Sequence, residues 1–448
     1  MEWLSIIRDS DPELHDYMKR ELERQQTSLE MIPSENFTSE AVMQAVGSML
    51  TNKYSEGYPG KRYYGGNEFI DKIERLAIER ARAAFGVEHA NVQPYSGSPA
   101  NMEVYLALCK AGDTIMGQSL TDGGHLTHGW STSATGQLFN SVQYHVRSDG
   151  YIDTDEVRRL ALEKKPRLIW VGSTAYPRAL PFKEFAQIAE ESGAYLAADI
   201  SHISGLVIGG VHESPVPYAH IVTTTTHKTL RGPRGAIIMV TKKGVEKDPE
   251  LPSKIDKSVF PGMQGGPHDH VTAAIATALA EASRPEFKEY AAQIVRNSRA
   301  LADELMRSNI KLVTNGTDNH LILADLTEIS PGVGVFVQDA LDMAGITMNK
   351  NTIPGETSSP FYPSGLRMGT PAITTRGMRE PEMRVIGGFI SEVIRSIGKP
   401  VLPTDKEERI AYLKNYRAEL KNNQTVKKVR AQVAELCSRF PLYPNMKV

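Results

Sequence analysis

The sequence has little of several features that would place a protein in a special class. It contains only two cysteines, Cys109 and Cys437, each within a helical pattern, so we expect neither a disulfide framework nor a zinc site. No apolar run approaches the roughly 18 residues that cross a membrane, and the first residues do not resemble a signal peptide. A net charge of only −2 gives no electrostatic case for binding nucleic acid or membranes. Together these absences predict a cytoplasmic globular protein.

The chain of 448 residues is long enough for a large core and roughly two or three structural domains. Beyond Pro166, apolar strands expected at 168–172, 195–200 and 221–226 alternate with helical segments, one of them at 181–193. Apolar strands separated by helices predict an α/β fold with a mostly parallel sheet covered on both faces. Ligands of such sheets bind beyond the carboxyl ends of the strands.

Lys228 lies at one of these strand ends and is the residue around which the chemistry is predicted. His227 precedes it, and a basic loop with Arg231 and Arg234 but no acidic residue follows. Positive neighbours lower the pKa of a lysine, which suits it to form a Schiff base with a carbonyl. A single lysine in a basic loop is far more often simply solvated, so the interpretation depends on the residues at the other strand ends.

Three more polar residues fall at or just after expected strand ends: Thr174, Asp199 and His202. Because these ends meet at one edge of the sheet, the four residues are expected to share a ligand site. Asp199 could merely cap a helix. Beside a Schiff-base lysine it is better interpreted as the partner of a pyridinium nitrogen in a bound ring. A negative partner keeps that nitrogen protonated, and a protonated ring is a stronger electron sink.

Two Gly-containing turns could approach a flat, phosphorylated ligand. Ser96-Gly97-Ser98-Pro99 leads into a helix, with Ser98 expected as N-cap, and such a helix start offers donors to a phosphate, although most are only caps. The turn at 122–129 carries His125 and His128 between glycines. A metal site there is a poor alternative because the sequence offers no third ligand nearby.

Other elements can be predicted from local patterns. Asp11 is expected to cap a first helix that begins at Pro12. A helix is expected at 68–85, with Phe69, Ile73 and Leu76 facing inward and Gly86 as its stop. The loop at 54–66 contains four tyrosines and four glycines, which is typical of a surface loop and sometimes of a binding loop.

The segment THKTLRGPRG, which contains Lys228, resembles the cofactor lysine motif of the serine hydroxymethyltransferase family. The similarity covers nearly the whole chain, from SENFTS at Ser34 to GTPAITTRG at Gly377, with its motifs in the family's order. It implies the α/β fold of fold type I pyridoxal-phosphate enzymes. The implied parts are an N-terminal helical arm (1–30), a cofactor-binding large domain (31–284) and a smaller C-terminal α/β domain with a helical tail (285–448).

The resemblance also implies an activity. The hydroxymethyl carbon of L-serine would be transferred reversibly to tetrahydrofolate, giving glycine and 5,10-methylenetetrahydrofolate. The cofactor would be pyridoxal 5'-phosphate, bound as a Schiff base on Lys228, and tetrahydrofolate would be the co-substrate. No metal is expected.

Roles are carried over to the matching positions of this sequence. The implied catalytic residues are Lys228, Glu56, His125, Asp199, His227 and Tyr64. The implied cofactor-binding residues are Ser96, Gly97, Ser98, His125, Thr174, Asp199, His202, Lys228, Tyr54, Gly265 and Gly266. Substrate binding is implied for Ser34, Glu56, Tyr64, His202 and Arg367, and folate binding for Leu120, Gly124, Leu126, Asn351, Ser359, Pro360 and Phe361. Thr174 departs from the family, which usually has serine there; the hydroxyl is kept.

The family's active sites are shared between subunits. By resemblance, the loop at 54–66 and the loop at 260–267 reach the site of a neighbouring chain, so a homodimer or homotetramer is expected. Helix residues after Pro12 could form an arm on that neighbour. The sequence does not separate the dimer from the tetramer.

Two other functions stay open. An aldolase or transaldolase of β-hydroxy amino acids would use the same cofactor without folate, and the presence of Glu56, Asn351 and the segment 359–361 argues against it. A catalytically silent pyridoxal-phosphate store is disfavoured by the intact Lys228 and Arg367.

Overall fold

The computed structural model describes residues 3–446, which form two compact units. Within these residues, the large unit comprises Ser34–Val295 and Thr317–His320, and the small unit comprises 3–33, 296–316 and 321–446. The division along the chain falls inside helix α13 (Pro285–Arg307). The three-part division into arm, large domain and small domain stays a prediction.

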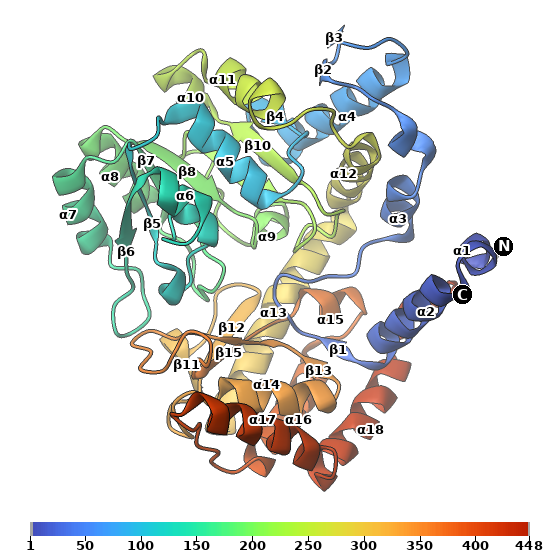
Figure 1. Ribbon diagram of the computed structural model, residues 1–448. Helices are drawn as coiled ribbons and strands as arrows, with labels where there is room; N and C mark the ends of the chain where they lie inside the picture. The colour runs from blue at the N-terminus through green and yellow to red at the C-terminus, as the bar shows by residue number, and fades with distance from the viewer. Residues whose placement is uncertain (1–2, 447–448) are drawn as a thin grey trace. The chain divides into compact units, whose positions relative to one another are not determined.

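A seven-stranded sheet organises the large unit, in the order β4-β10-β9-β8-β7-β5-β6 (Figure 1). Neighbouring strands from β6 to β9 run parallel, whereas β10 runs antiparallel to β9 and β4. The mostly parallel α/β sheet expected from the apolar runs is therefore confirmed. The strands are β4 (His89–Asn91), β5 (Thr114–Gln118), β6 (Asn140–Tyr144), β7 (Leu168–Val171), β8 (Tyr195–Asp199), β9 (Ile221–Thr225) and β10 (Ala236–Val240).

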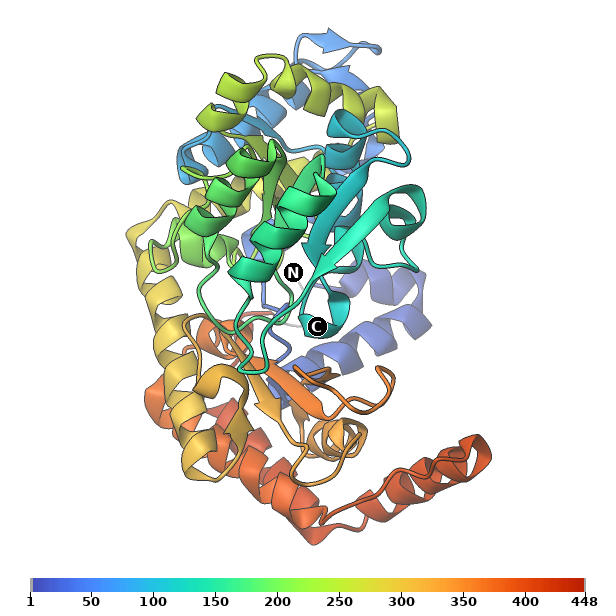
Figure 2. The ribbon, with the colours of Figure 1, turned by 90° about the vertical axis from the view of Figure 1, so that its left-hand side faces the viewer.

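Both faces of this sheet are buried. In β7, Leu168 and Trp170 belong to one hydrophobic cluster, whereas Ile169 and Val171 belong to another. This alternation follows from the two-residue period of a strand and explains why the strand carries no polar residue. One face packs on α5 (Gly97–Leu108) and α11 (Leu251–Lys257). The other packs on α4 (Glu68–Phe85), α7 (Thr154–Lys164), α8 (Phe182–Ser192), α9 (Ser204–Ile208) and α12 (Asp269–Ala282). Figure 2 looks onto α7 and α8, with strands behind them.

Helix α4 has the predicted bounds, and Gly86 ends it in the left-handed conformation at φ 72°. The predicted inward face is wrong. Phe69 is 68% exposed and Leu76 40%, whereas Ala77 and Ala81 are fully buried. Helix α12 packs against α4, and small alanines allow two helices to approach closely, so the alanine face turns inward. Phe69 and Leu76 are left on the surface, whereas Ile70 and Phe85 are buried with the alanines.

The remaining elements of the large unit are short. A two-stranded hairpin, β2 (Gly57–Tyr58) with β3 (Lys61–Arg62), forms within the loop at 54–66. The others are α3 (Glu40–Val46), η1 (Met49–Asn52), η2 (Leu120–Asp122), η3 (Leu126–His128), α6 (Ala134–Leu138), α10 (Lys242–Lys247) and η4 (Ser258–Met263).

The small unit contains a four-stranded antiparallel sheet in the order β11-β12-β15-β14. Its strands are β11 (Lys311–Leu312), β12 (Leu321–Asp325), β14 (Asn349–Asn351) and β15 (Gly365–Gly369). A separate parallel pair joins β1 (Leu29–Glu30) to β13 (Ile346–Thr347). The helices are α1 (Ser5–Ser10), α2 (Pro12–Thr27), α14 (Gly334–Met343), α15 (Pro371–Thr375), α16 (Glu380–Ser396), α17 (Lys406–Leu420) and α18 (Gln424–Ser438), and η5 spans Val313–Asn315.

The predicted start of the first long helix is confirmed, because Pro12 is the first residue of α2 and the Asp11 side chain accepts a hydrogen bond from Leu14 N at 3.0 Å. Leu14, Tyr17 and Met18 on this helix are exposed. Among residues 3–446, no helix is both long and apolar enough to span a membrane.

Candidate active site

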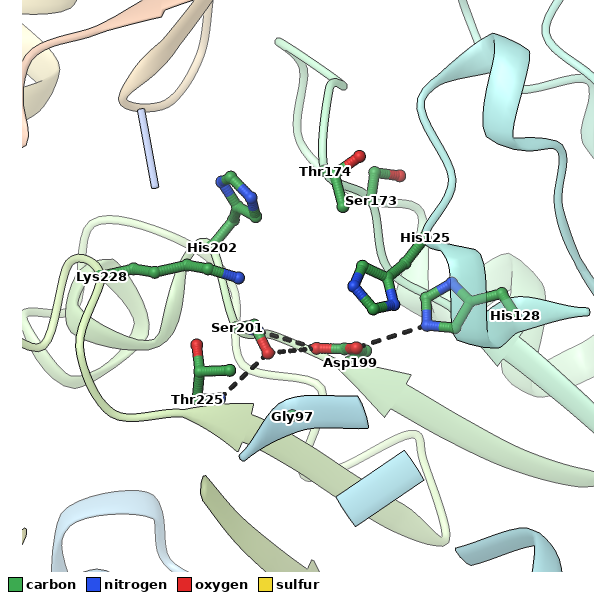
Figure 3. A pocket seen from close by; sticks show the side chains of 10 residues that line it. All are labelled: Gly97, His125, His128, Ser173, Thr174, Asp199, Ser201, His202, Thr225 and Lys228. Atoms are coloured by element: carbon green, nitrogen blue, oxygen red, sulfur yellow. Dashed lines mark hydrogen bonds and ion pairs between the residues drawn. The ribbon is translucent and has the colours of Figure 1, made fainter. Parts of the chain in front are cut away.

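A pocket opens where three strands of the large unit end (Figure 3). Asp199 closes β8, Thr225 closes β9, and Lys228 follows β9, with its side chain extending into the pocket. The first residue of α5, Gly97, lies at the same edge. The lining residues are Gly97, His125, His128, Ser173, Thr174, Asp199, Ser201, His202, Thr225 and Lys228. The structure thus brings together the four residues that the sequence placed at strand ends, with His125.

Asp199 is held by four hydrogen-bonding groups. Its Oδ1 accepts from Ser201 N at 3.0 Å and Ser201 Oγ at 2.6 Å. Its Oδ2 accepts from Asn101 Nδ2 at 2.9 Å and lies 3.3 Å from His128 Nε2. Burial alone would raise the pKa of Asp199, but the bond to His128 and the positive neighbours outweigh burial and hold this pKa well below its ordinary value. The pocket therefore contains a fixed negative charge.

His125 offers a neutral, flat ring. Burial, together with the nearby His128 and Lys228, lowers the pKa of His125 to about 4. Its Nδ1 lies 2.7 Å from Thr127 Oγ1, which fixes the orientation of the ring. Gly123 and Gly129 on either side adopt φ values of 96° and 98°, so the turn needs its glycines. A neutral ring held in this way is suited to stack on another aromatic ring.

Side chains from the segment at 34–39 hold the loop of Lys228. Asn36 Nδ2 donates to the carbonyl oxygen of Lys228 at 2.9 Å, and Thr38 Oγ1 donates to that of Arg231 at 2.7 Å. Arg231 has a φ of 59° and stacks over the Tyr290 ring at 4.2 Å. The lysine therefore extends from a loop whose backbone is fixed.

His202 and Thr174 are both tied to their surroundings. His202 Nδ1 lies 3.2 Å from His320 Nε2, and both rings are buried. Thr174 Oγ1 lies 2.8 Å from the carbonyl oxygen of Gly124 and 3.2 Å from that of Gly123. The threonine hydroxyl thus joins the end of β7 to the turn that carries His125.

His227 points its Nε2 toward Arg234 at 3.5 Å and does not line the pocket. Burial, with Lys228 and Arg234 nearby, lowers the pKa of His227 to about 3. Leu120 lies in η2, and Gly124 and Leu126 flank His125. Ser34 is half-buried and does not line the pocket either.

Five other predicted residues form a second cluster in the large unit, away from the pocket lining. The rings of Tyr54 and Tyr64 make an edge contact at 5.5 Å. The charge of Glu56 raises the pKa of Tyr64, so these side chains interact. A Cβ on Gly265 would lie 3.3 Å from Glu56 Oε1, and one on Gly266 would lie 3.1 Å from the Tyr54 ring. Tyr54 and Tyr64 are exposed.

The remaining predicted residues belong to the small unit. Arg367 lies in β15 and donates from Nε to Asn349 Oδ1 at 3.0 Å. Burial lowers the pKa of Arg367 to about 10. Asn351 ends β14, and Phe361, which follows Ser359 and Pro360, is 80% exposed.

Two sequence inferences about the site were wrong. Ser98 does not cap α5, because the helix begins at Gly97 and Ser96 is its N-cap. The argument that no third metal ligand is nearby also fails, since ligand atoms of His125, His128 and Asp199 lie within 4.8 Å of one another. Asp199 comes from a distant strand, which the local sequence could not show. Its four hydrogen bonds account for this arrangement.

Several pocket residues were missed. Ser173, Ser201 and Thr225 also lie at strand ends, so the same rule could have identified them. Asn101 could not be identified from the sequence. It lies in the second turn of α5 and contacts Asp199 only because of how this helix packs on the sheet.

The pocket fits pyridoxal phosphate. Lys228 supplies the amine, and Asp199 supplies a buried anion for a protonated pyridine nitrogen. Ser96 makes no side-chain cap at the start of α5, which leaves backbone donors at a helix N-terminus for a phosphate. A Cβ on Gly97 would approach Thr225 Cγ2 to 2.7 Å, so only glycine allows this close packing.

A mostly parallel sheet with this lysine, aspartate and helix start defines a pyridoxal-phosphate enzyme of fold type I. The model of the family described as serine hydroxymethyltransferase matches residues 7–390, and the chain belongs to that family. It is a transferase of one-carbon metabolism that uses pyridoxal phosphate as cofactor and tetrahydrofolate as co-substrate.

Several proteins named serine hydroxymethyltransferase are similar to this chain over most of their length. A serine hydroxymethyltransferase of Acidothermus cellulolyticus is 53% identical over 98% of this chain and 97% of its own. One of Desulfotalea psychrophila is 53% identical over 88% of this chain and 91% of its own. One of Nostoc punctiforme is 49% identical over 99% of this chain and 97% of its own.

Proposed function

We propose that this chain converts L-serine and tetrahydrofolate to glycine and 5,10-methylenetetrahydrofolate, reversibly, with Lys228 as the lysine that holds the cofactor. The observation that carries this proposal is the pocket in which Lys228 extends toward the fixed charge of Asp199 beside the neutral ring of His125. When bound, pyridoxal phosphate supplies an electron sink for the bonds at the amino-acid Cα.

The residues of the pocket would bind and orient the cofactor. The negative charge of Asp199 would keep a proton on the pyridine nitrogen, and the neutral ring of His125 would face the cofactor ring. The N-terminus of α5, with Ser96, Gly97 and Ser98, would bind the phosphate. Thr174 keeps the His125 turn in place through its bond to Gly124, and His202 contacts the cofactor or the substrate carboxylate. The role of His227, next to Lys228, is to tune reaction specificity.

Arg367 is assigned to the substrate carboxylate. A guanidinium binds a carboxylate by two parallel hydrogen bonds, which fixes the orientation of the amino acid. Asn349 already holds Nε of this arginine. Ser34 is a further substrate contact in this proposal. The segments around Asn351 and Ser359–Phe361, together with Leu120, Gly124 and Leu126, would receive the folate.

We also propose that two chains share each active site in a homodimer or a homotetramer. Tyr54, Gly265 and Gly266 would approach the phosphate bound by the neighbour, while Glu56 moves protons at the substrate and Tyr64 contacts it. The support is that these residues already lie together, partly exposed, and away from their own pocket. The exposed apolar side chains of α2 and α4 are suited to such an interface. Two free cysteines favour a cytoplasmic location.

Borohydride reduction of the cofactor-loaded protein, followed by peptide mass spectrometry, tests the assignment of the lysine. We expect the reduced pyridoxyl group on Lys228. A label on another lysine would contradict the proposal. The Lys228→Ala variant is the matched control and should stay unlabelled.

A further inference from the structure

Ser55 lies between Tyr54 and Glu56, the two residues proposed to reach the neighbouring site. Its side chain is completely buried, and its Oγ donates to Asp269 Oδ1 at 2.7 Å. Asp269, the first residue of α12, is only 3% exposed. Within residues 3–446, Asp269 Oδ2 makes no hydrogen bond, so the serine hydroxyl is the hydrogen-bond donor to this carboxyl.

The segment that carries Asp269 is itself held firmly. Gln264 Nε2 donates to the carbonyl oxygen of Gln93 at 2.9 Å, and Tyr95 N donates to Gln264 Oε1 at 2.9 Å. Tyr95 Oη donates to the carbonyl oxygen of Gly266 at 2.7 Å, and its ring stacks on His268 at 4.1 Å. The stretch from Gln264 into α12 therefore provides a fixed support next to the loop at 54–66.

The loop has a second anchor on its backbone. Arg62 Nη1 donates to the carbonyl oxygens of Ser55 at 2.7 Å and Gly57 at 2.9 Å. Arg62 is itself paired with the buried Glu74 at 2.6 Å and with Asp71 at 2.8 Å. Ser55 is thus fixed both through its carbonyl and through its hydroxyl.

Exposure alternates along residues 54–56. Ser55 is buried and points inward to Asp269, whereas Tyr54 is 60% exposed and Glu56 is partly exposed. They lie over Gly266 and Gly265, which belong to the same supported stretch as Asp269. The contact between Ser55 and Asp269 therefore fixes the position and direction of the Tyr54 and Glu56 side chains.

We propose that Ser55 and Asp269 form a positioning pair that holds Tyr54 and Glu56 over Gly265 and Gly266. This inference rests on the proposed function, in which Tyr54 and Glu56 act at the neighbour's cofactor and substrate. Neither member of the pair touches the reacting atoms; both act through the two residues that flank Ser55. The hydrogen bond, rather than the negative charge of Asp269, is what the pair requires.

The test uses the full-length, cofactor-loaded protein and three variants. Asp269→Leu keeps the approximate shape but removes the acceptor, Ser55→Ala removes the donor, and Asp269→Asn is the matched control that keeps an acceptor oxygen. We measure kcat and KM for glycine formation from serine with tetrahydrofolate, the dissociation constant of pyridoxal phosphate, and amide hydrogen exchange in residues 53–66.

We expect Asp269→Leu and Ser55→Ala to lower kcat roughly 10- to 100-fold, because a displaced catalytic group costs that much. Both should weaken cofactor binding and speed exchange in the loop. Asp269→Asn should stay within about threefold of the wild type in kcat, since its acceptor is retained. The double variant Ser55→Ala/Asp269→Leu should be no worse than Asp269→Leu alone.

Normal kcat and unchanged loop exchange in Asp269→Leu would overturn the proposal. Equal losses of kcat in Asp269→Leu and Asp269→Asn, in step with lost thermal stability, would also overturn it and leave a structural role. If the wild type itself forms no glycine, the proposed function fails. The Ser55–Asp269 pair is then tested by amide hydrogen exchange in residues 53–66 alone, and faster exchange in Asp269→Leu but not in Asp269→Asn supports it.

Discussion

At the scale of single residues, the pocket depends on one buried negative charge. Asp199 is the end residue of β8, and its partners come from α5, from η3 and from the residues that directly follow β8. Because its pKa lies far below neutral, this charge stays constant over the whole range of physiological pH. The pH dependence of the activity should therefore not reflect ionisation of Asp199.

The Asp199→Asn substitution removes the charge and keeps the shape. We expect the variant to bind pyridoxal phosphate, because Lys228 and the start of α5 are untouched. Its kcat should fall by at least about 100-fold, since an uncharged partner no longer keeps the pyridine nitrogen protonated. Cofactor absorbance and glycine formation measure the two effects separately, and a kcat within tenfold of the wild type would contradict the assignment.

Glu103 on α5 gives a prediction about pH and stability. It is fully buried, neither carboxyl oxygen has a hydrogen-bond partner within residues 3–446, and burial raises its pKa to about 8. A folded-state pKa above the ordinary 4.5 means that the unfolded chain loses this proton first. Stability is therefore lost as pH rises from about 4.5 to about 8.

Glu103→Gln removes the titrating group. We expect unfolding in denaturant to show a gain of about 3–5 kcal/mol for this variant at pH 9 relative to the wild type. At pH 4 the difference between the two proteins should be much smaller, because both side chains are then neutral. The same difference at both pH values would refute the interpretation.

Residue chemistry at the strand ends could be predicted, because uncharged β-branched runs mark buried strands and polar residues that follow them must share one edge. Thr174, Asp199, His202 and Lys228 were found in this way. Asn101 could not be found, since its role depends on which face of α5 meets β8. Ser98 was misplaced because two serines precede Pro99 and either can cap a helix.

At the scale of elements, the short local patterns predicted where helices begin and end better than which face they bury. Gly86 and Asp11 ended and began helices as expected. The prediction of the buried face of α4 was wrong. That face depends on α12, which lies far along the chain, and on the fit of Ala77 and Ala81 against α12.

Arg376 shows how a single side chain can join elements in the small unit. It is 7% exposed and donates to carbonyl oxygens near the end of α2 and the end of α18. These acceptors belong to Gln25, Gln26, Ser28, Cys437 and Phe440. Helix ends leave carbonyl groups without helical partners, so a planar cation with five donors can satisfy several at once.

Arg376→Met should therefore destabilise the small unit by about 2–4 kcal/mol. Thermal unfolding measures the loss, and limited proteolysis should cut first near the ends of α2 and α18. Arg395→Met, at an exposed position on α16, is the matched control and should change little. Equal melting temperatures for the wild type and Arg376→Met would show that the carbonyl contacts contribute nothing.

At the scale of the whole molecule, the proposed sharing of sites between chains can be tested by complementation. Lys228→Ala and Glu56→Gln should each be nearly inactive. In a mixed dimer, one site would combine the intact Lys228 of one chain with the intact Glu56 of the other. Refolding equal amounts together should restore about a quarter of wild-type activity, since half of the dimers are mixed and each holds one complete site.

Activity that stays at the level of the separate variants would place both residues in a site built from one chain. Mixing either variant with itself under the same conditions is the control. Size-exclusion chromatography with light scattering, run on the same samples, reports whether mixed dimers or tetramers have formed.

The most direct test of the central claim is glycine formation from L-serine by the pyridoxal-phosphate-loaded protein, with and without tetrahydrofolate. We predict strong dependence on tetrahydrofolate, with 5,10-methylenetetrahydrofolate formed in equal amount. Little stimulation by tetrahydrofolate, together with rapid cleavage of threonine-like substrates, would contradict the account and make the protein an aldolase or transaldolase of β-hydroxy amino acids.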